Sequence, residues 1–367
     1  MNKRMNAEKS KIRFTVCAVL LSYTVVVALL CIFSRSFSES YCRIVSAFLR
    51  GIISSITGIF PFSVAEVLLF LIPFVWIVYE IANIFRRGFK FKRFAFRLFA
   101  FVSILAFLFV NAFGVCYTRR PLEENMGFEV VEFSDSELKA SAEFIKERLE
   151  DVCEKVNFSQ NGASENPHDW ITLNEEIDIG FERMRKEYPF LSVIDANAKR
   201  IALSRFMTYT HISGIFIPFT AEANVNTNYP DYVVAFSTAH EKAHQRGIAG
   251  EDEANFVAFL SCLASGDAYL EYAALLSMYD YYLDEAFSSD KEMYYELLNN
   301  TDKRILREMY AYSVFFDKYR DSTASVVADK VNDTYIKTMG DGGGIKSYGR
   351  VVKLATSYLI QKEALPY

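Results

Sequence analysis

The sequence predicts a mainly α-helical membrane protein, in which N-terminal transmembrane helices precede a mostly helical soluble domain with a small β element. Two observations predict this class. Apolar stretches, each near the roughly 20 residues that cross a bilayer, lie in the N-terminal part of the chain. Apolar residues at helical spacing fill most of the remainder, and residues 212–230 lack that period. Hydrophobic residues make up 51% of the 367 positions, which excludes a disordered chain.

Three segments are long and apolar enough to span a membrane. Residues 14–33 are uncharged and no small-residue cleavage site follows them, which favours a transmembrane helix over a signal peptide. Residues 41–60 are apolar but interrupted by Arg43, Arg50 and two glycines. We interpret them as an interfacial amphipathic helix, with a re-entrant piece or a fourth span as alternatives. The membrane region therefore covers residues 1–117, with predicted spans at 14–33, 63–85 and 95–117.

Basic residues set the expected orientation of these spans. They cluster in the N-terminal tail and in the loop between the second and third spans, which carries Arg86, Arg87, Lys90, Lys92, Arg93 and Arg97. Cytoplasmic loops are rich in Lys and Arg. We therefore expect a multi-pass plasma-membrane protein with a cytoplasmic N-terminus and an extracytoplasmic domain at 118–367. The basic loop lies beside the inner-leaflet lipids, so no nucleic-acid partner is expected.

The soluble domain is expected to be mostly helical. Residues 134–156 open with a Ser/Asp cap and keep apolar residues at helical spacing. The stretch "GIFIPFT" within 212–230 is β-like. "GDGGG" at 340–344 breaks the helical pattern. Further helices are predicted at 174–188, 231–246, 251–265, 267–286, 288–300, 302–339 and 347–362.

The six cysteines form no CxxC pair, which argues against a cysteine zinc site. Cys17, Cys31 and Cys116 lie within or beside apolar segments, where a thiol behaves as a small hydrophobic group. The spacing leaves a disulfide between Cys153 and Cys262 open.

The segment "STAHEKAHQRGIAGEDEANFVAFL", residues 237–260, carries the candidate chemistry. His240 and His244 are two of only four histidines, and residues four apart lie on one face of a helix. Both can therefore point at one metal ion, and Glu241 can act as general base on a metal-bound water. A zinc ion held in this way takes a third protein ligand and keeps its fourth position open for water.

Acidic residues after the histidine helix are the candidates for the third ligand. Two glycines in "QRGIAG" suit a sharp turn, after which Glu251 begins the next predicted helix. Glu251 is the favoured ligand and Glu253 is the alternative. Asn255, four residues after Glu251, is expected to support a metal-binding histidine through a hydrogen bond. Gly250 stands where a third histidine would complete the longer H-E-x-x-H-x-x-G-x-x-H pattern, which is therefore excluded.

The pattern "HEKAHQRG…EDEANF" is similar to that of the gluzincin metallopeptidases, in which HExxH is followed by Glu-x-x-x-Asp on a second helix. Asn255 stands here in place of that Asp. The resemblance implies a zincin-like α+β fold for the soluble domain and zinc as cofactor. The chain also resembles an uncharacterised bacterial family of three-span membrane proteins with a domain of unknown function, through the segments 60–69, 214–226, 239–262 and 341–352.

Other residues are candidates for supporting roles. A zinc peptidase needs a donor for the oxyanion, and His211, Tyr348 and Arg350 are candidates, although a lone histidine is more often structural. In gluzincins an edge strand near the zinc pairs with an extended peptide. "PFTAEANVN", residues 218–226, is expected to be either that strand or an ordinary loop.

Together these residues predict a membrane-anchored zinc metallopeptidase that hydrolyses peptide bonds of an extracytoplasmic protein or peptide with metal-activated water. His240, His244 and Glu251 would bind Zn²⁺. The alternative is a non-hydrolytic envelope protein whose metal site is structural or degenerate and acts in assembly or sensing. The charged residues of 231–253 exclude this segment from the hydrocarbon core, so proteolysis inside the membrane is not expected.

Overall fold

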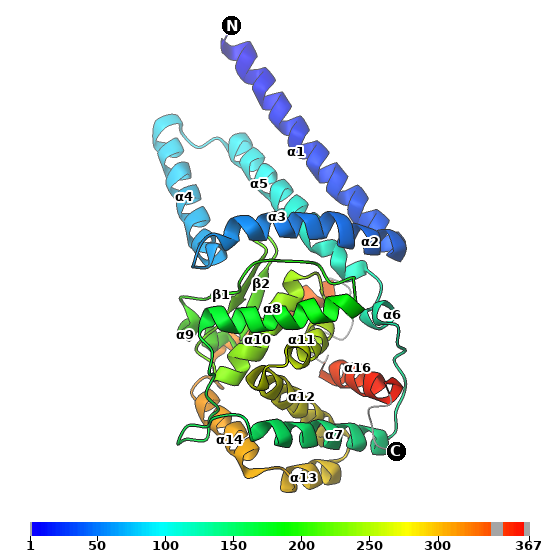
Figure 1. Ribbon diagram of the computed structural model, residues 1–367. Helices are drawn as coiled ribbons and strands as arrows, with labels where there is room; N and C mark the ends of the chain where they lie inside the picture. Colours follow the sequence, from blue (N-terminus) through cyan, green and yellow to red (C-terminus); the bar gives the residue numbers. More distant parts are fainter. Residues whose placement is uncertain (1, 339–347, 363–367) are drawn as a thin grey trace. The chain divides into compact units, whose positions relative to one another are not determined.

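The computed structural model describes residues 2–338 and 348–362. The chain divides into two compact units (Figure 1), which are described separately. The first unit comprises Met1–Arg120 together with Ile217–Glu222. The second unit comprises Pro121–Phe216 together with Ala223–Tyr367.

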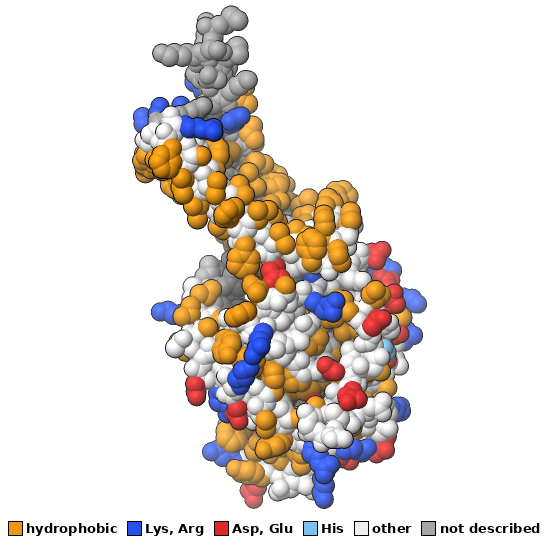
Figure 2. All heavy atoms as spheres, turned by 90° about the vertical axis from the view of Figure 1, so that its left-hand side faces the viewer, with side chains coloured by type: hydrophobic (Ala, Val, Ile, Leu, Met, Phe, Trp, Pro, Cys, Tyr) orange, Lys and Arg blue, Asp and Glu red, His pale blue; other side chains and the backbone are white. Residues whose placement is uncertain are grey.

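The first unit is built from apolar helices. α1 and α5 pack along each other, and α3 lies crosswise to α1, α4 and α5 at one end of these helices (Figure 1). Hydrophobic side chains cover this unit, and Lys and Arg gather where the loop between α4 and α5 lies (Figure 2). Its elements are α1 (Asn2–Phe33), α2 (Arg35–Tyr41), the π-helical turn η1 (Cys42–Ser46), α3 (Ala47–Gly58), α4 (Val64–Arg87), α5 (Phe91–Ala112) and the 3₁₀ turn η2 (Gly114–Thr118).

Three of these helices are long and apolar enough to cross a membrane. Among the described residues they cover Lys11–Phe33, Val64–Arg86 and Phe91–Ala112. They confirm the three predicted apolar helices and fit a membrane protein. The third, predicted to reach residue 117, ends at Ala112 because Phe113 leaves the helical conformation with φ of −147°.

Residues 41–60 add no fourth candidate span in the described part of the chain. Their main helix, α3, has 12 residues, about 18 Å at 1.5 Å per residue, which is shorter than the hydrocarbon core.

The disulfide of this protein joins Cys42 to Cys116, whose Cα atoms are 5.6 Å apart. Cys116 is therefore not the free hydrophobic thiol that its apolar neighbours predict. The pairing of Cys153 with Cys262 is wrong. Both of these thiols are free and buried among hydrophobic side chains of the second unit.

The second unit is mostly helical with a small sheet, as predicted. Its first elements are α6 (Leu122–Met126), α7 (Asp135–Cys153), α8 (Trp170–Glu187), β1 (Lys199–Arg200), α9 (Ser204–Met207), the 3₁₀ turn η3 (Thr208–Thr210), β2 (Gly214–Ile217) and β3 (Glu222–Val225). It continues with α10 (Asp231–Gln245), α11 (Glu251–Ser265), α12 (Ala268–Ser289), α13 (Lys291–Asn299), α14 (Lys303–Asp317), α15 (Thr323–Thr338) and α16 (Tyr348–Gln361).

Two predicted helix boundaries are wrong. α8 begins at Trp170 rather than residue 174, because the Asp169 carboxylate accepts hydrogen bonds from two amides of the first turn. The stretch 302–339, predicted as one helix, forms α14 and α15. The Ser322 hydroxyl accepts a hydrogen bond from the Ala324 amide, which starts the second of them.

α12 lies in the core of the second unit and packs against α7, α10, α11, α13 and α16. α8 approaches α11 very closely at Gly180, where a Cβ atom would lie 2.0 Å from the carbonyl oxygen of Ser261. Tight packing of this kind fixes the positions of α10 and α11, which carry the candidate site.

The sheet has three strands in the order β1-β3-β2. β1 runs parallel to β3, with Lys199 opposite Asn224. The amide of Thr220 bonds to the Ile217 carbonyl and reverses the chain between β2 and β3. The interpretation of residues 218–226 as an edge strand is therefore wrong, because β3 within that segment is the central strand. Within the described residues, β1 and β2 are the outer strands of the sheet.

Candidate metal centre

The histidine helix α10 and the acidic helix α11 are joined by a tight turn. Gly247 has φ of 95°, a left-handed conformation that costs glycine little. The Ile248 amide bonds back to the Ala243 carbonyl of α10. This turn folds the start of α11 against the last turns of α10, as the two glycines of the sequence predict.

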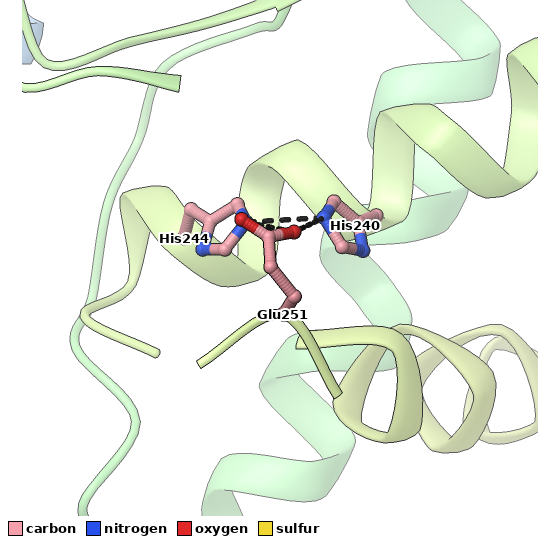
Figure 3. Close-up of side chains that lie close together, drawn as sticks. All are labelled: His240, His244 and Glu251. Carbon is pink, nitrogen blue, oxygen red and sulfur yellow. Dashed lines mark hydrogen bonds and ion pairs between the residues drawn. The ribbon is translucent and has the colours of Figure 1, made fainter. Parts of the chain in front are cut away.

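Three side chains converge at this junction (Figure 3). The Nε2 atoms of His240 and His244 are 3.0 Å apart, and Glu251 Oε2 lies 3.2 Å from the first and 3.5 Å from the second. One ligand atom from each residue lies within 4.8 Å of the other two. Zinc binds histidine nitrogen and carboxylate oxygen at about 2.0–2.2 Å, so one ion can contact all three atoms after small adjustments.

The outer nitrogen of each imidazole is held by an oxygen. His240 Nδ1 lies 2.8 Å from Asn255 Oδ1, and His244 Nδ1 lies 2.7 Å from the carbonyl oxygen of Ile248. A carbonyl oxygen only accepts, so each Nδ1 carries the proton that it donates. Nε2 of each ring is then the nitrogen available to a metal, and both rings are held in the orientation that ligation needs. Asn255 occupies the supporting position that the sequence predicts.

Glu241 is buried against strand β2. Its carboxylate accepts a hydrogen bond from the backbone of Phe216, and its Oε2 atom has no hydrogen-bond partner among the described residues. A Cβ atom at Gly214 would lie 2.5 Å from Glu241 Oε1, so only glycine leaves room for this carboxylate. Burial raises the pKa of Glu241 to about 7, against the opposing effect of His240 and His244.

The charges of the cluster stabilise each other in the absence of a cation. Burial alone would lower the pKa of His244, but Glu251 and Glu241 outweigh it and raise this pKa to about 9. Burial likewise opposes ionisation of Glu251, but the two histidines hold the pKa of this carboxyl well below its ordinary value. A metal ion at this site would require the three ligand atoms to be deprotonated.

The three acidic residues at the start of α11 point to different partners. Glu251 lies beside the histidines. Asp252 pairs with Arg350 of α16 at 2.8 Å. Glu253 Oε1 accepts a hydrogen bond of 2.9 Å from the amide of Leu122. The geometry therefore brings Glu251 to the candidate site and directs Glu253, the alternative ligand, to α6.

A family match covers most of the chain. The family described as "Protein of unknown function (DUF3810)" matches residues 41–356, which include α4, α5 and the three converging side chains. The chain belongs to this family. No curated protein and no solved structure matches the chain. The predicted likeness to an uncharacterised family is confirmed, and the family's description assigns no activity.

Of the three candidate oxyanion donors, the structure describes the side chains of His211 and Arg350. His211 has φ of 61°, and its Nε2 lies 2.8 Å from the carbonyl oxygen of Tyr319. That nitrogen donates to a main-chain acceptor in the second unit. Tyr348 begins α16, and its side chain lies outside the described residues. Arg350 is engaged by the acidic residues at the start of α11.

The face of α10 opposite the histidines carries buried cations that sequence reasoning missed. Lys242 Nζ lies 2.9 Å from Asp178 Oδ2 and 3.1 Å from Asn174 Oδ1. Arg246 donates to Asp178 Oδ1 at 2.6 Å and stacks over the Phe181 ring. The charges of Lys242 and Arg246 suggest solvent exposure, yet both side chains are buried. Lys242 and Arg246 are four residues apart and so lie on one face of the helix, and this spacing could have indicated that they share a partner.

The donor set fits zinc better than a hard cation. Two imidazole nitrogens and one carboxylate are ligands of catalytic zinc sites, whereas Mg²⁺ and Ca²⁺ prefer oxygen ligands alone. The two supported imidazoles and the buried, partly unpartnered Glu241 carboxylate match this chemistry.

Proposed function

We propose that this chain is a membrane-anchored zinc metallopeptidase of the gluzincin type, which hydrolyses peptide bonds of an extracytoplasmic protein or peptide. One observation carries the proposal. His240 Nε2, His244 Nε2 and Glu251 Oε2 converge on one point while acceptor oxygens hold both Nδ1 atoms. A chance HExxH helix has no reason to orient both rings in this way.

The neighbourhood of the trio supports a zincin-like arrangement for the second unit. The histidine helix α10 is followed by α11 with its acidic residue, and β2 lies against Glu241 through Gly214 and Phe216. β2 is at an end of the strand order. An extended peptide that adds to this edge as a further strand would pass beside Glu241.

The residues of this chain have separable roles in the proposed reaction. His240, His244 and Glu251 hold the zinc ion, which supplies a Lewis acid and activates water when bound. Glu241 takes a proton from the attacking water and delivers it to the leaving amine. Its buried carboxylate, with one oxygen free among the described residues, is suited to holding that proton. Asn255 and the Ile248 carbonyl keep the histidines oriented.

Two features of the first unit support an extracytoplasmic second unit. Structural disulfides persist in oxidising compartments, and Cys42–Cys116 lies beside the end of α5 from which the chain leaves the first unit. The basic residues 86–97 lie at the other end of α4 and α5, as the cytoplasmic side requires.

Metal analysis tests the site. Purified full-length protein should contain about one zinc per chain, as expected for a single three-ligand site. His240→Ala and Glu251→Ala should remove the zinc. Glu253→Ala is the matched control, because its carboxylate bonds to Leu122 instead, and this variant should keep the zinc. Wild-type protein without zinc, or zinc loss from Glu253→Ala alone, would overturn the assignment.

Hydrolysis is tested separately on a pool of internally quenched peptides of mixed sequence. Glu241→Gln should retain zinc and lose cleavage, because the amide cannot accept the proton. If the Glu241→Gln variant binds zinc but the wild-type protein cleaves no peptide, the result would favour a structural metal site over a peptidase.

The orientation is tested with single exposed cysteines in intact cells. Ser288→Cys in the second unit should react with a membrane-impermeant maleimide, and Lys92→Cys in the basic first turn of α5 should react only after the cells are opened. The reverse pattern would place the second unit in the cytoplasm.

A further inference from the structure

Helix α3 of the first unit carries an apolar stripe on its exposed side. Ile44, Phe48, Ile52 and Ile56 recur every four residues along η1 and α3, and their exposed fractions range from 44% to 70%. Residues four apart lie on one face of a helix. The stripe therefore forms one continuous exposed surface. It is unlike the polar outer face that a helix in water normally presents.

Most polar side chains of the same segment are buried instead, and Arg43 and Ser55 are the exposed exceptions. Arg50 is fully buried and donates to the carbonyl oxygen of Ala112 at 2.7 Å. Ser46 donates to the Asn111 carbonyl at 2.6 Å. Arg50 is the only charged residue between positions 44 and 62, so the exposed side of α3 carries no charge. This distribution is the inverse of a water-facing amphipathic helix.

The contacts of α3 and of the residues just before it fix the position of α3 along the axis of α5. Ala112 is the last residue of α5, and Asn111 precedes it. Ser38 of α2 bonds to the Val115 carbonyl just beyond, and the disulfide joins Cys42 to Cys116. A helix that crossed the bilayer beside α5 would contact successive turns of α5. These bonds all meet its last residues and η2, and α3 lies crosswise to the spans (Figure 1).

The stripe is continuous with the apolar surface of a span. Phe60 and Phe62 follow α3, are exposed, and lie 5.6 Å apart between ring centroids. They lead to Leu69, Phe70 and Phe74 of α4, which are also exposed. Glu66 is the single charged residue between Phe62 and Leu69, and it is only half-exposed. An apolar surface of this extent that leads into a membrane span matches hydrocarbon better than a protein partner, whose interface would have a polar rim.

We infer that α3 lies in the plane of the membrane at the disulfide-bearing end of the spans, with the stripe inserted among the acyl chains of that leaflet. The partner is the lipid surface itself. Arg50 and the disulfide hold α3 rigidly against α5 and turn its apolar side outward. Unlike a reversible surface anchor, this helix is a fixed part of the membrane unit.

Nitroxide accessibility of the full-length protein in phosphatidylethanolamine and phosphatidylglycerol vesicles tests the inference. Spin labels are attached to the variants Phe48→Cys and Ile52→Cys. No reductant is added, so the disulfide stays closed, and the four free cysteines do not compete for the label because they are buried. Phe74→Cys on α4 is the lipid control. Tyr310→Cys on α14 is the aqueous control, with 70% exposure against 66% for Phe48. Both α3 labels should collide with oxygen more than with a soluble nickel chelate, as at Phe74.

Depth separates a surface helix from a spanning one. Ile44 and Ile56 are 12 positions apart in the sequence, which is about 18 Å along a helix. Labels at these two positions should have nearly equal depth if α3 lies in the membrane plane. A depth difference near the full helix length would overturn the inference. The inference would also be overturned if the labels at Phe48 and Ile52 collided more with the nickel chelate than with oxygen. Labels that collided with neither reagent would likewise overturn it, because they would indicate a protein partner or a second copy of the chain.

Discussion

The two units of this protein treat hydrophobic and charged side chains in opposite ways. The first exposes Phe48 and Phe74 and buries Arg50, whereas the second buries Tyr272 and Tyr279 in an aromatic-rich core. Their buried cations also differ. Arg50 donates to a main-chain carbonyl, but Lys242 and Arg246 share the carboxylate of Asp178. The exposed apolar side chains of the first unit fit a lipid environment, whereas internal packing and a buried ion pair stabilise the second unit.

The largest expected effect in this comparison comes from breaking the buried ion pair. Asp178→Asn leaves Lys242 and Arg246 without their carboxylate, and such losses cost about 3–5 kcal/mol of unfolding free energy. Urea unfolding of the full-length protein in a Trp76→Phe background, followed by Trp170 fluorescence, measures it. Lys139→Met breaks the exposed Lys139–Glu296 pair and should leave the unfolding midpoint nearly unchanged. Equal losses in the two variants would contradict the distinction.

The second prediction concerns Gly214, the contact between β2 and Glu241. A methyl group there would displace the Glu241 carboxylate, since its Cβ would lie 2.5 Å from Oε1. A misplacement of about 1 Å costs on the order of 100-fold in rate. Gly214→Ala should lower kcat on the quenched-peptide pool by about this factor. Zinc content should stay unchanged, because Gly214 touches none of the three ligands. If the Gly214→Ala variant kept the wild-type kcat, Glu241 would have no role in the reaction.

The same substitution in both units sharpens the contrast in packing. Gly180→Ala forces α8 away from α11 and should destabilise the second unit by about 1–3 kcal/mol. In α3, a Cβ at Gly51 meets no atom within 4 Å. Gly51→Ala should therefore stabilise that helix by about 0.5–1 kcal/mol through lower backbone entropy. Thermal unfolding in vesicles compares the two, and destabilisation by Gly51→Ala would mean that α3 is packed by a protein partner.

A similarly small effect is expected at a helix cap in the first unit. Glu222 accepts hydrogen bonds from the amides of Val64 at 3.0 Å and Ala65 at 2.7 Å, at the start of α4. Glu222→Ala should cost about 1 kcal/mol, as other N-terminal caps do. Glu222→Gln should cost less because its amide oxygen still accepts. Hydrogen exchange at residues 64–67 measures the loss, and unchanged protection in Glu222→Ala would exclude a capping role.

Local patterns in the sequence predicted most of the helices and the three side chains that meet at the candidate metal centre. The apolar lengths identified α1, α4 and α5, and the i, i+4 spacing put His240 and His244 on one face of α10. Sequence spacing favoured Glu251 over Glu253, and the geometry agrees in bringing Glu251 beside the histidines. These predictions succeeded because each depends on residues within a few helical turns of one another.

Contacts between distant segments were not predictable in the same way. Cys116 resembled a buried hydrophobic residue, because nothing near it in the sequence points to Cys42. Lys242 and Arg246 resembled surface charges, because Asp178 lies on another helix. Residues 218–226 resembled an edge strand, because strand order depends on how the chain reverses at Ile217.

The sequence by itself determined three long apolar helices that fit a membrane protein and a His-Glu-His helix followed by an acidic one, because length and periodicity specify helices locally. Only the tertiary structure decided which glycine admits Glu241 and which side of α3 faces outward. Each of these depends on surfaces brought together from remote parts of the chain, where packing and burial, rather than local spacing, select the contact.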